Sequence, residues 1–120
     1  MKTNVIQVKS YSFALRIVKY YHVFVKQSWE RNLARQLLRS GTSIGANVEE
    51  AIGGQSDKDF LSKMSIAYKE ARETKYWLRL LRDSVMISNA AADSLLVDCE
   101  EILKIIGSIQ TTMKSKIHYS

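Results

Sequence analysis

The sequence predicts an all-α fold, an antiparallel up-down-up-down four-helix bundle, and three observations support this class. The chain has 120 residues, 46% hydrophobic and 25% charged, which suits one ordinary globular domain over residues 1–120. It contains no proline and only five glycines, whereas folds of many short strands usually need more of both at their turns. Apolar residues recur at steps of three and four over long segments, as on helices. Helices at about 8–26, 29–52, 57–85 and 89–115, joined by short connectors, are therefore expected to pack as antiparallel neighbours.

The first predicted helix, 8–26, is apolar around more of its circumference than a surface helix usually is. One face holds five apolar or aromatic residues: Phe13, Ile17, Tyr20, Tyr21 and Phe24. A second face beside it holds Tyr11, Val18 and Val25 at steps of seven. A surface helix of a monomer shows one apolar stripe, so this surplus predicts either burial on two sides or a subunit interface.

The second predicted helix, 29–52, contains two interior glycines, Gly41 and Gly45. Its apolar residues at helical spacing are Leu33, Leu37, Ile44, Val48 and Ala51. Each glycine costs about 1 kcal/mol relative to alanine inside a helix, so local propensity alone also allows a loop over 41–45. We favour a continuous helix, because the two glycines share one face, where missing side chains let a neighbouring backbone approach closely.

The third predicted helix, 57–85, has the most regular apolar pattern in the chain. Ser56 and Asp59 fit a capping box at its start. Its heptad seam is Phe60, Met64, Ala67, Ala71, Thr74, Leu78, Leu81 and Val85. Such a stripe predicts coiled-coil-like packing against a partner helix.

The fourth predicted helix, 89–115, has a similar seam. Asn89 is the predicted N-cap, and Asp93 lies in the first turn, where the helix dipole favours a carboxylate. The seam is Ala92, Leu96, Cys99, Leu103, Ile106, Gln110 and Met113.

Residue types needed for common catalytic or metal sites do not occur at the required spacing. Dinuclear metal centres in four-helix bundles use Glu-x-x-His pairs, but Lys19 precedes His22 by three residues and Ser115 precedes His118. The single cysteine, Cys99, lies on an apolar seam, where a thiol is protonated and unreactive. No Gly-Lys-Ser/Thr follows the glycines, as a phosphate-binding loop requires. We expect no catalytic residue, no metal and no cofactor.

Targeting and compartment are also predicted from the composition. No run of 18 apolar residues and no secretory leader pattern occurs, and one thiol cannot form an intramolecular disulfide. We therefore expect a cytoplasmic protein that does not associate with a membrane.

Basic residues dominate, and they are unevenly distributed. The formal net charge is +6; residues 1–48 hold eight Lys or Arg against Glu30 alone, while residues 83–103 hold five acids and no base. Two stripes of cations follow the helical period, and together they are the predicted nucleic-acid-binding residues: Arg31, Arg35 and Arg39, then Arg72, Lys75, Arg79 and Arg82. Such stripes can bind phosphates without sequence preference. The alternative is a solvated charged face that complements the acidic helix.

Local pairs and aromatic residues refine this picture. The i,i+4 spacing predicts ion pairs between Lys69 and Glu73 and between Arg79 and Asp83.

Aromatic residues occur near the cations: Tyr20, Tyr21, Tyr68, Tyr76 and Trp77. Exposed rings can stack on bases, but we expect most of these to pack in the core or, for the last two, in an intersubunit contact.

Two segments carry a family resemblance: QLLRSGTSIGANVEEA over 36–51 and FLSKMSIAYKEARETKYWLRLL over 60–81. They resemble the signature segments of the 23S rRNA intervening-sequence protein family, also known as four helix bundle proteins. On the second helix the matching residues are Arg39, Ser40, Gly41, Ser43, Ile44, Asn47, Glu49 and Glu50. On the third they are Phe60, Ala67, Lys69, Glu70, Ala71, Glu73, Thr74, Tyr76, Trp77 and Leu78.

The resemblance implies an antiparallel four-helix bundle that assembles into a homopentameric ring with a basic surface. It also implies that Gly41 and Gly45 lie inside a helix, and that the fold is similar to the accessory variability determinant proteins of diversity-generating retroelements. No enzymatic activity is implied, and nucleic-acid binding is the standing proposal for the family. Our first hypothesis is a non-enzymatic homo-oligomeric scaffold that binds RNA or DNA, or presents it to a nucleic-acid-processing protein. The alternative is a protein-interaction or assembly module that binds no nucleic acid.

Overall fold

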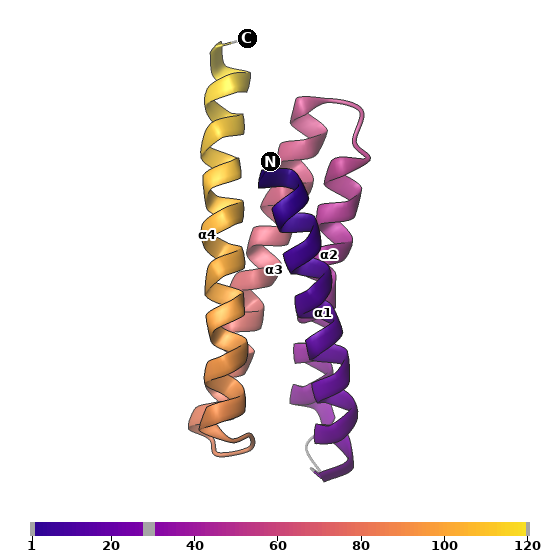
Figure 1. Ribbon diagram of the computed structural model, residues 1–120, viewed down its shortest axis with the longest axis vertical. Coiled ribbons are helices and arrows are strands. Elements are labelled where there is room, and N and C mark those ends of the chain that lie inside the picture. Colours follow the sequence, from indigo (N-terminus) through magenta and orange to yellow (C-terminus); the bar gives the residue numbers. More distant parts are fainter. Residues whose placement is uncertain (1, 28–30, 120) are drawn as a thin grey trace.

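The chain folds into four long helices that lie side by side along one axis. The computed structural model describes residues 2–27 and 31–119, with side chains over 4–26 and 31–118. The helices are α1 (Lys2–Gln27), α2 (Arg31–Ile52), α3 (Asp57–Asp83) and α4 (Asn89–Tyr119). Each runs antiparallel to the one before it, which confirms the predicted four-helix bundle (Figure 1). The bundle measures 52 × 21 × 21 Å.

Helices that are consecutive in the sequence pack against one another, and α4 closes the bundle against α1. The contact between α2 and α3 is the largest and that between α1 and α4 the smallest. Charged residues bridge this α1–α4 seam: Lys9 pairs with Glu101, and Arg16 pairs with Asp98. Arg16 also donates a hydrogen bond of 2.8 Å to the hydroxyl of Ser94. Part of the predicted attraction between basic and acidic helices is therefore satisfied inside the chain.

The helices differ from their predicted bounds mainly at the ends. The first begins at residue 2 instead of 8, and the fourth extends to 119 instead of 115. Residues 29 and 30, which the sequence placed in the second helix, lie outside the described residues. Helix ends are the part of a helix that periodicity constrains least, because the apolar pattern weakens where the bundle ends.

The predicted seam of α3 forms the centre of the core, apart from its two ends. Ser56 caps the helix as expected, accepting a hydrogen bond of 3.1 Å from the backbone N–H of Asp59. The residues of the seam that are fully buried are Met64, Ala67, Ala71, Thr74, Leu78 and Leu81. Phe60, at the start of the seam, is half-buried and packs against the core.

Val85 does not belong to the seam, and the prediction was wrong there. The helix ends in a Schellman motif, in which Met86 N–H donates to the Leu81 carbonyl (2.9 Å) and Val85 N–H to the Arg82 carbonyl (3.0 Å). Val85 therefore has a φ of 61° and is 86% exposed. Ile87, which is 5% exposed, covers this end of the core instead. The heptad spacing in the sequence thus extends to Val85, which lies two residues beyond the end of the helix at Asp83.

The core-facing line of α4 is also displaced from the predicted seam. Its buried residues are Ala92, Leu95, Cys99, Ile102, Ile106 and Ile109. The predicted Leu96 and Leu103 are half-buried, and Gln110 hydrogen bonds to Ser65 of α3 (3.2 Å). Because α4 packs between α3 and α1, its core-facing residues lie between these two helices, whereas the predicted seam is shifted toward α3.

The N-cap of α4 is Ser88 instead of the predicted Asn89. The Ser88 hydroxyl accepts a hydrogen bond of 3.1 Å from the backbone N–H of Ala91, which is the geometry of an N-cap. Asn89 is the first helical residue.

Both glycines of α2 lie inside the continuous helix, as predicted, and the neighbour that approaches them is α1. A Cβ atom at Gly41 would lie 2.9 Å from Cγ1 of the buried Ile17. A Cβ atom at Gly45 would lie 3.3 Å from the backbone carbonyl oxygen of Ser10. The absence of these two side chains lets α1 pack close to α2.

Candidate nucleic-acid interface

The seven cations predicted to bind nucleic acid divide into two groups. Arg39, Lys75 and Arg82 form ion pairs with carboxylates of the same chain. The remaining four are exposed, and no carboxylate of the described residues lies within 4.0 Å of them: Arg31, Arg35, Arg72 and Arg79. The four unpaired arginines are therefore the members of the predicted site that are available to an anionic ligand.

Arg39 pairs with two carboxylates of the neighbouring helix. Its guanidinium donates to Glu70 (3.1 Å) and to Glu73, and its Nε lies 3.3 Å from Oε1 of Gln36. The pair to Glu73 replaces the predicted pair between Lys69 and Glu73, which does not form. Glu73 therefore pairs with Arg39 of α2, which is 34 residues away in the sequence, and not with Lys69 of its own helix.

Lys75 and Arg82 link α3 to α4. Lys75 pairs with Glu100, and Arg82 pairs with Asp83 (2.9 Å) and Asp93 (3.0 Å). Hydrogen bonds to these two aspartates raise the pKa of Arg82. The prediction of an ion pair between Arg79 and Asp83 is therefore also wrong, because Asp83 pairs with Arg82 instead.

An exposed stripe runs along α3 between these paired residues. It consists of Lys69, Arg72, Tyr76 and Arg79, at steps of three, four and three, and we call it the α3 stripe. Its three cations have no carboxylate partner among the residues that the structure describes. The flanking acids Glu70 and Glu73 share Arg39 as their partner, which compensates part of their charge, and the three unpaired cations of the stripe exceed the charge that remains.

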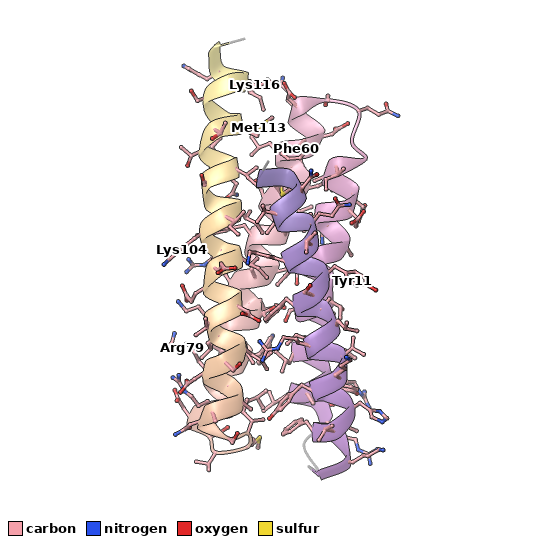
Figure 2. The ribbon with its side chains drawn as sticks, viewed as in Figure 1. Tyr11, Phe60, Arg79, Lys104, Met113 and Lys116 are labelled. Carbon is pink, nitrogen blue, oxygen red and sulfur yellow. The ribbon has the colours of Figure 1, made fainter. Side chains whose placement is uncertain are left out.

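Two cations of this surface were not among the predicted site residues. Lys69 extends the spacing of Arg72 and Arg79 by one step, and that periodicity is the pattern that identifies it. Lys104 of α4 is exposed and likewise has no carboxylate partner within the described part of the chain. In Figure 2 Arg79 and Lys104 both extend past the edge of α4, on the side away from α1. No sequence pattern links residues 79 and 104, because only the packing of α3 on α4 brings them to one side.

The outer face of α1 is apolar and exposed. It carries Val8, Tyr11, Leu15 and Val18, which we call the α1 apolar stripe, at steps of three, four and three. These side chains are 65%, 69%, 44% and 45% exposed, in that order. Tyr11 lies on α1, across the molecule from Arg79 (Figure 2). The predicted apolar surplus of the first helix is thus real. Of its predicted second face, Tyr11 and Val18 are exposed, while Val25 is half-buried and packs against the core.

The aromatic residues separate into packed and exposed rings. Tyr20, Tyr21, Tyr68 and Trp77 are half-buried and pack against the core. Partial burial raises the pKa of Tyr20. Tyr76 is different, because it is 55% exposed in the middle of the α3 stripe.

Cys99 is fully buried. Its Sγ–H donates to the carbonyl oxygen of Ala71 (3.3 Å), and burial raises the pKa of the thiol to about 12. The thiolate that a nucleophile or metal ligand needs is thus strongly disfavoured at neutral pH.

The described residues contain neither a metal-binding cluster nor a membrane span. They contain no group of three or more His, Cys, Asp or Glu side chains placed to hold a metal ion. Of the helices described, none combines the length and the apolar character that a membrane span requires.

Comparisons with known proteins agree with this architecture. A search of curated proteins found no match. A crystal structure of a protein with unknown function from the S23 ribosomal protein family of Bacteroides thetaiotaomicron matches with a TM-score of 0.90 and 47% sequence identity, covering 92% of this chain and 99% of that one. The family model described as 23S rRNA-intervening sequence protein matches residues 2–108. The chain therefore belongs to the 23S rRNA-intervening sequence protein family.

Proposed function

We propose that this protein is a non-enzymatic, homo-oligomeric scaffold that binds RNA or DNA through phosphate contacts without sequence preference. The observation that carries the proposal is the α3 stripe, in which Arg72 and Arg79 are exposed and free of carboxylate partners among the described residues. An arginine that is already paired must give up its carboxylate to bind a phosphate, whereas an unpaired one does not. Arg31 and Arg35 of α2 and Lys104 of α4 extend the available positive charge.

The excess of charge supports the same proposal. The formal net charge is +6, and in the part of the chain that the structure describes nine acids form ion pairs. The acids are thus largely neutralised internally, while a set of cations remains at the surface. Cations that neutralise phosphates release bound counterions, which makes the affinity fall steeply with salt.

The α1 apolar stripe supports the oligomeric part of the proposal. Four large apolar side chains in heptad spacing on one exposed helix face are typical of a surface that packs against another helix. Every helix of the bundle already has its neighbours inside the chain, so the stripe has no intramolecular helix to cover it. A second copy of the chain offers the same stripe, and the family resemblance implies five copies.

Nucleic-acid binding is tested by a salt titration with a matched pair of variants. Arg72→Gln with Arg79→Gln removes two charges from the α3 stripe, and Lys58→Gln with Lys114→Gln removes two exposed charges elsewhere. Fluorescence anisotropy with labelled RNA and DNA should show binding at low salt that weakens as salt rises. The arginine double variant should bind more weakly and flatten the log–log salt slope by about 1–2, since each phosphate contact contributes about 0.7–0.9.

Two results contradict nucleic-acid binding at this surface. One is the absence of salt-sensitive affinity in the wild-type protein, which favours the alternative of a protein-interaction or assembly module. The other is an equal loss in the lysine control, which shows that net charge matters but the α3 stripe does not.

Assembly is tested separately by sedimentation velocity. Leu15→Glu places a charge in the α1 apolar stripe, and Val85→Glu places one at an exposed apolar residue in a turn. We expect the first variant to be monomeric and the second to keep the oligomer of the wild type. A monomeric wild-type protein at micromolar concentration contradicts the oligomeric part of the proposal and leaves the nucleic-acid part intact.

A further inference from the structure

We propose that Tyr76 is a stacking surface for an unpaired base, so that the α3 stripe binds single-stranded RNA or DNA in preference to duplex. This inference rests on the proposed nucleic-acid binding and specifies its substrate class. Tyr76 is 55% exposed, with Arg72 four residues before it and Arg79 three residues after it on the same helix face. A ligand whose phosphates contact both arginines must pass over the ring between them.

The position of the Tyr76 ring is set by a neighbour. The rings of Tyr76 and Trp77 are in edge contact, with centroids 5.1 Å apart and planes at 73°. Trp77 is half-buried and packs against the core, so it supports the tyrosine from one side. Aromatic pairs of this geometry are favourable, and the contact limits the conformational freedom that Tyr76 would lose on binding a base.

The other tyrosines whose side chains the structure describes lack this combination of exposure and charge. Tyr11 is 69% exposed, but its neighbours at steps of three and four are Val8 and Leu15, which suit a protein contact. Tyr20 is half-buried and stacks on Phe24, with centroids 6.1 Å apart. Among the described tyrosines, Tyr76 is the exposed ring that lies between unpaired cations.

An exposed aromatic ring between cations favours single-stranded over double-stranded nucleic acid. In a duplex both faces of each base are covered by stacked neighbours, so a side chain on a helix surface reaches phosphates but not base faces. In a single strand an unpaired base can turn onto an aromatic ring while its flanking phosphates contact cations. From residue 69 to residue 79 the α3 stripe rises about 15 Å, which is long enough for a few nucleotides.

The acids nearest to Tyr76 do not oppose this binding. Glu73 lies three residues before it and Glu70 six before it, and both pair with Arg39. Glu100, across the α3–α4 contact, pairs with Lys75. The nucleic acid would therefore meet carboxylates that are each paired with a cation, and the single charge left uncompensated at Glu70 and Glu73 is smaller than that of the three unpaired cations of the stripe.

The experiment compares a single-stranded oligonucleotide with a hairpin duplex of the same length at one low salt concentration, by fluorescence anisotropy. We expect the wild-type protein to bind the single strand more tightly. Tyr76→Leu keeps an apolar side chain but removes the aromatic face, and it should weaken single-strand binding by about five- to 150-fold, the range for loss of one base–aromatic stack. Duplex binding should not change, and Tyr76→Phe should retain single-strand affinity.

Controls keep the outcomes distinct. Val97→Ala trims an apolar side chain that is 67% exposed on α4, outside both the α3 stripe and the α1 apolar stripe, and it should leave both affinities unchanged. Circular dichroism of each variant checks the fold. If both probes bind with salt dependence and Tyr76→Leu affects neither or both equally, this inference is overturned while the proposed function stands. If the wild-type protein binds neither probe, the proposed function itself is overturned, and the stacking site with it.

Discussion

The hydroxyl of Thr74 in α3 lies 2.9 Å from the hydroxyl of Ser40 in α2, and both residues are fully buried. Thr74 Oγ1 also lies 2.8 Å from the carbonyl oxygen of Glu70. This polar pair sits in the largest helix contact of the bundle, among apolar residues. Because a buried hydroxyl needs a partner, the pair favours one alignment of α2 against α3 over slipped ones.

We expect Thr74→Val and Ser40→Ala each to lower the free energy of unfolding by about 1–2 kcal/mol, since each leaves a buried hydroxyl with fewer partners. The double variant should cost about 1 kcal/mol less than the sum of the two, because the hydrogen bond is lost only once. Urea denaturation measures all three. Strictly additive losses would show that the two hydroxyls are not coupled.

Val85→Gly should stabilise the protein by about 1 kcal/mol. Val85 has a φ of 61° at the position of a Schellman motif that glycine usually occupies, and a β-branched residue is strained there. Val97→Gly makes the same change at an exposed position inside α4, where it should destabilise. Thermal unfolding of the two variants should therefore shift in opposite directions, and a shift of the same sign would contradict the strain at Val85.

Gly41→Ala should destabilise the bundle by about 1–2 kcal/mol despite the better helix propensity of alanine. Its Cβ would lie 2.9 Å from Cγ1 and 3.0 Å from Cγ2 of Ile17, a fully buried side chain, and overpacking of this kind outweighs the propensity gain. Gly107→Ala is the matched control, because its Cβ would meet only Tyr68 Cε2 at an ordinary 3.8 Å. Chemical denaturation should show a gain of about 0.5–1 kcal/mol for the control.

Cys99 predicts a loss of stability at alkaline pH. The pKa of its thiol is raised from 9.0 to about 12 in the folded state, so the unfolded state releases this proton at lower pH than the folded state. Its contribution to stability is therefore complete below pH 9 and declines between about pH 9 and pH 12, by up to about 1.4 kcal/mol per pH unit.

This pH dependence is checked with Cys99→Ala. The variant should be less stable than the wild type at pH 7, because it leaves a small cavity, but its stability should fall less steeply between pH 9 and pH 10.5. Parallel curves for the two proteins would contradict the raised thiol pKa. As a second readout, an aromatic disulfide reagent should react with Cys99 slowly in the native protein and rapidly after unfolding.

Arg39 should influence nucleic-acid binding through the carboxylates that it pairs with. Arg39→Gln leaves Glu70 and Glu73 uncompensated beside the α3 stripe, and we expect affinity for RNA or DNA at low salt to fall by about three- to 30-fold. The triple variant with Glu70→Gln and Glu73→Gln should restore the affinity to near that of the wild type. If the triple variant binds as weakly as Arg39→Gln, the arginine contacts the nucleic acid directly.

The four-helix architecture was predictable because the helical period is a local property. The buried line of α3 from Met64 to Leu81 and the cap at Ser56 both follow from residues close together in the sequence, whereas the continuous helix through Gly41 was favoured because a neighbouring helix could approach it closely. The surplus of apolar residues on α1 was predictable for the same reason, since it follows from the spacing of residues within one helix.

The candidate interface was predictable only as a set of cations. The sequence placed seven Lys and Arg side chains on two helix faces and paired Lys69 with Glu73 by their spacing. In the folded chain Arg39 reaches Glu73 from another helix, which leaves Lys69 unpaired and adds it to the α3 stripe. Likewise, Asp83 pairs with Arg82, so Arg79 has no carboxylate partner among the described residues.

By itself, then, the sequence determined how many helices form, roughly where each lies and which residues share a face. The tertiary structure decided which line of α4 meets the core, that Val85 leaves the helix, and which cations keep their charge exposed. The physical reason is that a helix face depends on residues within two turns, whereas an ion pair between helices depends on how each helix is rotated and aligned against its neighbour. That alignment is set by packing across the whole bundle.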